Sequence, residues 1–317
     1  MSTARSHASA EPWPTLRVND WTDSRETLHM WLQIVGKLRL AGAPMVNHWW
    51  QTTLYVTPRG LTTSSIPDRT RTFSIDLDFH EHRLHVNADS GARPVVALEP
   101  KSVSAFYDDV MSALREVGIE LTINATPNEV EPAIPFAEDH QHRSYDPEAV
   151  HLFWRQLVQA DRVMQAFRGR YVGKVSPVHF FWGSMDLACT RFSGRRAPRH
   201  PGGAPNCPDW VMEEAYSHEL SSCGFWPGGG DEGAFYAYGY PEPAGFRDHP
   251  VIPDAAFYSS EFSQYLLPYE AVRTAEDPDA TLLSFLQSTY EAAAVNGGWD
   301  RDELEHQPAA GDSPARA

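Results

Sequence analysis

Two histidines and two carboxylates in the second half of the chain have the residue types and spacing of a catalytic or metal site. They are His179, Asp186, Glu214 and His218. The stretch 211–224 is predicted to be a strand, in which residues two apart share a face, so Glu214 and His218 would point the same way. With His179 from a neighbouring strand they form a set of two histidines and one carboxylate, which suits zinc or non-haem iron.

The same residues fit two other interpretations. Glu214 could hold the tautomer of His218, which would make this histidine a general base without a metal. Alternatively, the histidines are satisfied groups that only stabilise an aromatic-rich sheet. The predicted acid–base residues are therefore His179, His218, Glu214 and Asp186, and a divalent metal held by His179, Glu214 and His218 is one alternative.

Lysine is rare in this chain and recurs in one local context. Only Lys37, Lys101 and Lys174 occur among 26 basic residues, and two of the three follow a Val-Gly step. A lysine ammonium can shift its pKa or form an imine, whereas a guanidinium cannot. We therefore include Lys174 among the candidate catalytic residues. The alternative is a cation that favours a helix C-terminus.

Positive charge is concentrated in one glycine-containing loop, which carries Arg191, Arg195, Arg196 and Arg199. Guanidinium groups bind carboxylate or phosphate through paired hydrogen bonds. Arg191 and Arg195, which adjoin the end of a predicted strand, are the candidate anion-binding residues. The alternative is a solvated loop paired with surface acids.

Aromatic residues crowd the predicted strands and could form a ligand pocket. Alternate strand residues face opposite sides, so some of these rings would fill the core and others would line a groove. Trp182, Trp226 and His48 are the predicted substrate-binding residues of such a groove. The alternative is that the rings are only core filling between a sheet and its helices.

Apolar spacing and capping residues predict four helices. The first is centred on 28–38, the second begins after Ser102 and ends at Gly118, the third begins after Asp146, and the fourth runs from Asp277 to Gly297. Strands are predicted at 49–57, 60–65, 72–79, 84–87, 178–190, 211–224 and 234–240. Because the strands come in runs rather than alternating with helices, we predict an α+β fold with antiparallel sheets covered by helices.

The order helix, strands, helix occurs twice, which predicts two similar halves packed as one unit. Val35-Gly36-Lys37 precedes His48, and Val172-Gly173-Lys174 precedes His179. The alternative is a chance match at two helix-to-strand turns. We assign residues 15–145 to the first half and 146–305 to the second, with polar tails at 1–14 and 306–317 that we expect to be disordered.

Composition limits the classes of partner. The chain has 317 residues and a formal net charge of −16, with 42% hydrophobic residues. A polyanion repels nucleic acid and anionic membranes, so we expect neither as a partner, and a local positive spot would attract a small anion instead. Three cysteines without a C-x-x-C pair and no secretory leader favour a cytoplasmic protein, and no apolar run predicts a membrane span.

Several long strings of residues resemble a known bacterial family. They are Gly173–Gly183 with Asp186–Ala188 and Thr190–Arg195, Glu214–Glu219, Gly224–Gly228, Phe235-Tyr236, Tyr240–Pro243 and Asn47–Trp50. Together they are similar to the uncharacterised family catalogued as domain of unknown function 5996. The resemblance implies one shared architecture over almost the whole chain, and it implies no activity, cofactor or catalytic residue.

These observations predict an enzyme of unknown reaction that acts on a small anionic molecule in an aromatic cleft. Its cofactor is unknown, and zinc or iron is a candidate. The competing hypothesis is a non-catalytic ligand-binding or scaffold protein, in which the same residues are structural.

Overall fold

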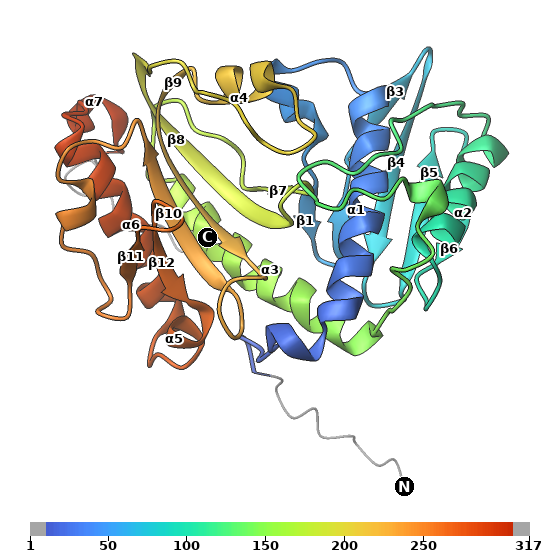
Figure 1. Ribbon diagram of the computed structural model, residues 1–317, viewed down its shortest axis with the longest axis horizontal. Helices are drawn as coiled ribbons and strands as arrows, with labels where there is room; N and C mark the ends of the chain where they lie inside the picture. Colours follow the sequence, from blue (N-terminus) through green and yellow to red (C-terminus); the bar gives the residue numbers. More distant parts are fainter. Residues whose placement is uncertain (1–10, 307–317) are drawn as a thin grey trace, which may run out of the picture.

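The computed structural model describes residues 11–306, which form two antiparallel sheets of six strands each, with helices against both (Figure 1). The predicted α+β class is confirmed. The predicted tails fall mostly on residues 1–10 and 307–317, outside the described range. Trp13, which the first tail was expected to include, is buried, and its indole Nε1 donates to Asp279. No helix within residues 11–306 is long and apolar enough to cross a membrane.

The first half consists of one sheet with two long helices against it. Its sheet has the order β1-β2-β4-β5-β6, with β3 paired to β4. The elements are η1 (Val18–Asp20), α1 (Thr22–Gly42), η2 (Asn47–Thr52), β1 (Tyr55–Thr57), β2 (Gly60–Thr62), β3 (Ile66–Asp68), β4 (Arg71–Asp78), β5 (Arg83–Ala88), β6 (Val95–Ala97), α2 (Val103–Glu116) and η3 (Phe136–Glu138).

The second half consists of the other sheet, with two long helices against one face and a short helix between two of its strands. Its sheet has the order β11-β12-β10-β9-β8-β7, and α3 and α6 cover one face of it. The elements are α3 (Pro147–Arg168), β7 (His179–Phe181), β8 (Asp186–Arg196), α4 (Asp209–Ala215), β9 (His218–Trp226), β10 (Ala234–Tyr240), η4 (Phe246–Asp248), β11 (Phe257–Ser259), β12 (Gln264–Pro268), α5 (Tyr269–Arg273), α6 (Pro278–Asn296) and α7 (Arg301–Leu304).

Three of the four predicted helices begin where their capping residues indicate. The side chain of Ser102 accepts a hydrogen bond from Ala105 N, that of Asp146 from two amides of the first turn of α3, and that of Asp277 from Ala280 N. Each cap satisfies backbone N–H groups that a helix leaves without a partner at its first turn. The starts of α2, α3 and α6 are therefore set locally, by side chains next to them in the sequence.

The two sheets meet edge to edge where β1 lies beside β7. Leu54 N donates to Phe180 O at 2.9 Å and Phe180 N donates to Leu54 O at 2.7 Å. Both residues are fully buried. This short bridge joins the halves and brings η2, from the first half, over the edge of the second sheet. Whether the halves arose by duplication stays a prediction.

Two predicted strands are wrong at the positions that matter most for a site. Residues 47–52 form the 3-10 element η2 rather than the start of a strand, and 209–215 form α4. In α4, the good helix formers Met212–Ala215 follow Pro208, and Val211 and Ala215 share one face at helical spacing. Glu214 therefore does not share a strand face with His218, which begins β9.

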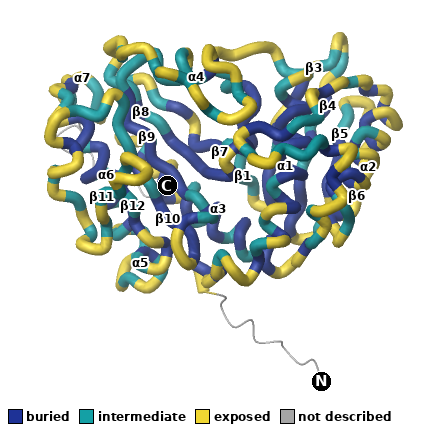
Figure 2. Tube along the Cα trace, viewed as in Figure 1, coloured by how far each residue is buried: buried dark blue, intermediate teal, exposed yellow. Residues whose placement is uncertain are grey.

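Arg191 lies in the core between the second sheet and its helices, and not in a surface loop. Its side chain is 1% exposed, and its guanidinium lies 3.4 Å from the ring centroid of Phe167 and 4.5 Å from that of Tyr290. One of its N–H groups donates to Phe167 O. Figure 2 shows the first part of β8 as buried, and α3 has buried residues along one side. Arg191 is thus a structural residue, held by α3 and α6.

We expect Arg191→Ala to lower the free energy of unfolding by about 3 kcal/mol, because truncation of a large buried side chain leaves a cavity. Arg195→Ala, in an exposed ion pair on the same strand, should cost less than about 1 kcal/mol. Urea unfolding of both variants measures the difference. Equal and small costs would contradict the structural role of Arg191.

Candidate functional site

A cavity of about 240 Å³ lies on the face of the second sheet that α3 and α6 leave uncovered. We call it the aromatic cavity. Strands β7 to β10 form its floor, α4 and η2 cover it, and the loops around Asn128 and Gly183 close one side. Its aromatic lining residues are Trp49, Trp50, Phe181, Trp182, Phe192, Tyr216, Tyr236 and Tyr238. Trp182, one of the predicted substrate-binding residues, lines this cavity.

Asp186 is the buried acidic group of this cavity. It begins β8, and its side chain accepts a hydrogen bond from the Tyr236 hydroxyl of β10. Tyr236 reaches across β9 because its strand partner there is Gly224, where an added Cβ would lie 2.4 Å from the tyrosine hydroxyl. A residue larger than glycine at 224 would therefore displace Tyr236 from the carboxyl group.

Burial raises the pKa of Asp186 to about 7. The Tyr236 hydrogen bond favours the charged form and works against this rise, whereas the nearby charge of Glu129 adds to it. A carboxyl group that titrates near neutral pH can both accept and donate a proton, as general acid–base catalysis requires. Asp186 was among the predicted catalytic residues, and in the structure it lines the aromatic cavity.

A second carboxylate, Glu129, lies at the side of the cavity. It accepts a hydrogen bond of 2.6 Å from the Ser184 hydroxyl, and its carboxyl group occupies the space beside Gly183 where a Cβ would be only 2.1 Å away. Asn128, next to it, accepts a hydrogen bond from the buried Lys37. No lysine or arginine of residues 11–306 lines the cavity itself.

Glu214 fixes the cover of the cavity instead of orienting His218. Its Oε2 accepts a 2.6 Å hydrogen bond from the backbone N–H of His48 in η2. His48 and Trp49 both have left-handed backbone angles, with φ of 45° and 58°, which cost about 1 kcal/mol or more each for residues with a Cβ. Two contacts with α4 hold this strained segment in place. One is the hydrogen bond to Glu214, and the other is the edge-to-face contact of Trp49 with Trp210.

His179 is held by a neighbour on the same cover. Trp50 Nε1 donates to His179 Nε2 at 2.6 Å, which leaves the ring proton on Nδ1. His179 is 1% exposed, and its Nδ1 has no hydrogen-bond partner among the described residues. Burial lowers the pKa of His179 to about 4, so the imidazole is neutral at neutral pH. The histidine joins η2 to β7. Its Nδ1 already carries the ring proton and its Nε2 accepts from Trp50, so neither nitrogen can take a proton from a ligand.

A wider outer cavity of about 800 Å³ adjoins the aromatic one. His48, Trp50, His179, Phe192 and Ala215 line both, so η2 and β7 form the wall between them. Lys174, Glu214 and His218 line the outer cavity. The structure thus brings five predicted site residues (His48, Lys174, His179, Glu214 and His218) around one opening, with Asp186 on the inner side of the wall.

The predicted anion clamp is wrong. Arg191 lies on the helix-covered face of β8, because consecutive strand residues face opposite sides. Arg195 is on the exposed end of β8, where it pairs with Glu219 and donates to the carbonyl oxygens of Gly297 and Gly298. Trp226 is not among the residues that line the aromatic cavity, and its ring packs against Phe262.

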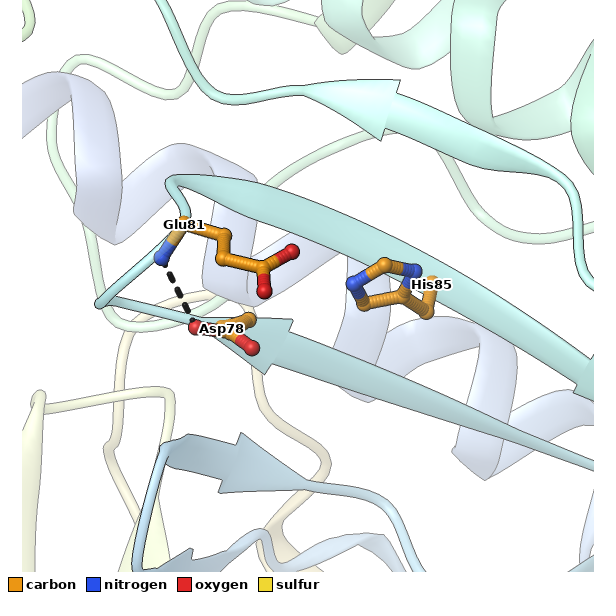
Figure 3. A group of neighbouring side chains, drawn as sticks. All are labelled: Asp78, Glu81 and His85. Carbon is orange, nitrogen blue, oxygen red and sulfur yellow. Dashed lines mark hydrogen bonds between the residues drawn. The ribbon is translucent and has the colours of Figure 1, made fainter.

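The predicted metal set does not converge. Among residues 11–306, His179, Glu214 and His218 do not place ligand atoms within 4.8 Å of one another, because Glu214 lies on α4 and contacts His48. A different group, Asp78, Glu81 and His85, does meet this distance at the turn between β4 and β5 (Figure 3). Arg59 already binds both of its carboxylates, at 2.5 and 3.1 Å, so a metal ion would have to displace a guanidinium.

Two features of the cavity were not predicted from the sequence. Glu129 and Asn128 come from an irregular segment between η3 and the end of α2 that has no motif. The second feature is the set of strand hydroxyls that line the cavity, from Thr190, Ser222 and Tyr238. For Tyr238 the sequence did hold a signal, because Tyr236 and Tyr238 are two residues apart in a predicted strand and so share a face. The hydroxyls of Tyr216, directly after α4, and Tyr238, on β10, are 2.9 Å apart, and this contact depends on the tertiary structure.

Comparison with protein families supports the resemblance noted in the sequence. The model of a family of unknown function, DUF5996, matches residues 13–306. The chain belongs to this family. Searches of curated proteins and of solved structures gave no match. Membership extends over both halves, so the aromatic cavity at their junction lies wholly within the matched region.

We expect the free energy of unfolding to fall as the pH drops from 6.5 to 4. His179 has a folded-state pKa of about 4, below the ordinary value, so the unfolded chain takes up the proton first, and stability is full above pH 6.5. The loss from this histidine is about 3 kcal/mol. His179→Asn should reduce the fall in urea titrations at several pH values, and a variant at exposed His140 should not. An unchanged pH dependence in His179→Asn would contradict this assignment.

We expect Tyr236→Phe to raise the pKa of Asp186 above its value of about 7, because the lost hydrogen bond favoured the charged carboxylate. Infrared spectra of the protonated carboxyl band over pH 5–9, with Asp186→Asn as the blank, measure the shift. A midpoint that stays in place or falls would show that Tyr236 does not stabilise the carboxylate.

Proposed function

We propose that the protein is an enzyme that acts on a small molecule held in the aromatic cavity, with Asp186 as the group that transfers a proton. The observation that carries this proposal is a buried carboxyl group at the floor of a partly enclosed aromatic cavity, where its pKa lies near 7. Buried carboxylates elsewhere in proteins are normally paired with a cation, so an unpaired one in a cavity suggests use in chemistry.

The other cavity groups have supporting roles in this proposal. Tyr236 tunes and orients the carboxyl group, and the Trp50–His179 pair keeps the inner wall in position. Lys174 and His218, in the outer cavity, would contact a ligand before it reaches Asp186. A reducing, cytoplasmic setting is also part of the proposal, and the three free cysteines support it.

A non-catalytic ligand-binding protein is the second candidate. One observation favours it: the polar groups around Asp186 are already engaged with one another, as Tyr216 is with Tyr238 and Ser184 with Glu129. Such a cavity can bind a ligand with little rearrangement, but it offers only one group that exchanges a proton near neutral pH.

Incubation of the purified protein with a metabolite extract, followed by untargeted mass spectrometry, tests the proposal. We expect the wild type to deplete at least one metabolite with time, and Asp186→Asn to slow this at least a hundredfold, as loss of a general acid or base does. Asp161→Asn, a carboxylate on α3 outside the cavity, is the matched control. Metabolites that are retained but never converted by the wild type would identify the binding protein instead.

A further inference from the structure

The charge of the aromatic cavity indicates which ligands it can hold. Its ionisable lining consists of two carboxyl groups, Asp186 and Glu129, two histidines, tyrosines and Cys207. Burial lowers the pKa of His48 and of His179 to about 4, so both rings are neutral at neutral pH. The cavity therefore has negative groups and no positive side chain in its lining.

Asp186 has no cation beside it among residues 11–306. Its side-chain partner is the hydroxyl of Tyr236, and the charged side chain that shifts its pKa is the carboxylate of Glu129, which raises it. Asp186 is only 8% exposed, so water screens this charge poorly. A carboxylate in this position needs either a proton or an external cation.

Lys37 does not supply that cation. Its ammonium donates to Asn128 Oδ1 and lies 5.9 Å from the ring centroid of Trp182, and the residue is not part of the cavity lining. The Lys37 ammonium therefore binds a neutral amide and not the carboxyl group of Asp186. Lys174, the other lysine near the site, lines the outer cavity and not the aromatic one.

The rings of the cavity favour a cation for a separate reason. The faces of tryptophan and tyrosine rings attract ammonium and guanidinium groups, most strongly where water is excluded. The rings of Tyr236 and Tyr238 on β10 lie nearly parallel, 17° apart, and the Tyr236 hydroxyl donates a hydrogen bond to Asp186. The net charge of −16 adds a long-range field that draws cations to the protein and repels anions.

We propose that the aromatic cavity binds a small organic cation, an amine in its ammonium form, with its charge at Asp186 and its apolar part against the rings. This inference rests on the proposed function in that it places the ligand at the same carboxyl group. It replaces the small anion that the arginine-rich loop led us to expect, because the arginines of that loop do not line this cavity.

Three probes share a phenyl ring on a short chain and differ in the charge of the end group: 2-phenylethylammonium, 2-phenylethanol and phenylacetate. Binding is measured by calorimetry at pH 8, above the Asp186 pKa of about 7, so that the carboxylate form predominates and the amine is protonated. We expect the ammonium to bind at least tenfold more tightly than the alcohol, and the carboxylate to bind more weakly than either. Asp186→Asn should bring the ammonium to the affinity of the alcohol.

Matched variants keep the result interpretable. Glu129→Gln should reduce the preference for the ammonium by a smaller factor, and Asp161→Asn should leave it unchanged. Equal binding of the three probes, tightest binding of phenylacetate, or a preference that survives in Asp186→Asn would overturn the inference. The two proposals can fail separately. Asp186-dependent conversion of a neutral or anionic metabolite would support the enzyme function and contradict the binding of an organic cation. Selective ammonium binding without turnover of any metabolite would support the cation and contradict the enzyme function.

Discussion

The pairing of β1 with β7 is the contact on which the candidate site depends. Two backbone hydrogen bonds between Leu54 and Phe180, both fully buried, join the edges of the two sheets. Edge strands present unpaired N–H and C=O groups, and here each edge satisfies part of the other. Because η2 immediately precedes Leu54, this pairing carries His48, Trp49 and Trp50 over the second sheet, where they form the wall between the two cavities.

The second constraint on the candidate site is the buried carboxyl group of Asp186, which has no cationic partner among residues 11–306. Two other buried carboxylates have guanidinium partners: Glu232 pairs with Arg273, and Asp78 pairs with Arg59. Asp186 has only a tyrosine hydroxyl, although burial makes its charged form costly. The arrangement is maintained by packing around it, above all by Gly224, which leaves room for Tyr236 to lie across β9. A site that sacrifices stability in this way is typical of binding or catalysis.

Local signals in the sequence predicted much of the fold and part of the site. Ser102, Asp146 and Asp277 cap the helices that they were expected to cap, because a cap acts on amides two or three residues away. The errors occurred where a segment depends on distant contacts. Residues 47–52 have the aromatic content of a strand, but Glu214 and Trp210 from α4 hold them in a strained 3-10 turn. Arg191 was expected to bind an anion because it adjoins a predicted strand end in an arginine-rich loop. The rings of Phe167 on α3, Tyr171 just after α3 and Tyr290 on α6 surround its guanidinium instead.

The sequence by itself determined the α+β class, the starts of three long helices and the membership of His179 and Asp186 in the second sheet, since these follow from spacing and capping along the chain. Only the tertiary structure decided what those residues face. The position of a residue in a strand determines which other residues share its face of the sheet. Which of the two faces is buried in the core depends on where α3 and α6 pack. That choice buried Arg191 among aromatic rings and left its strand neighbours Thr190 and Phe192, with Asp186, to line the cavity.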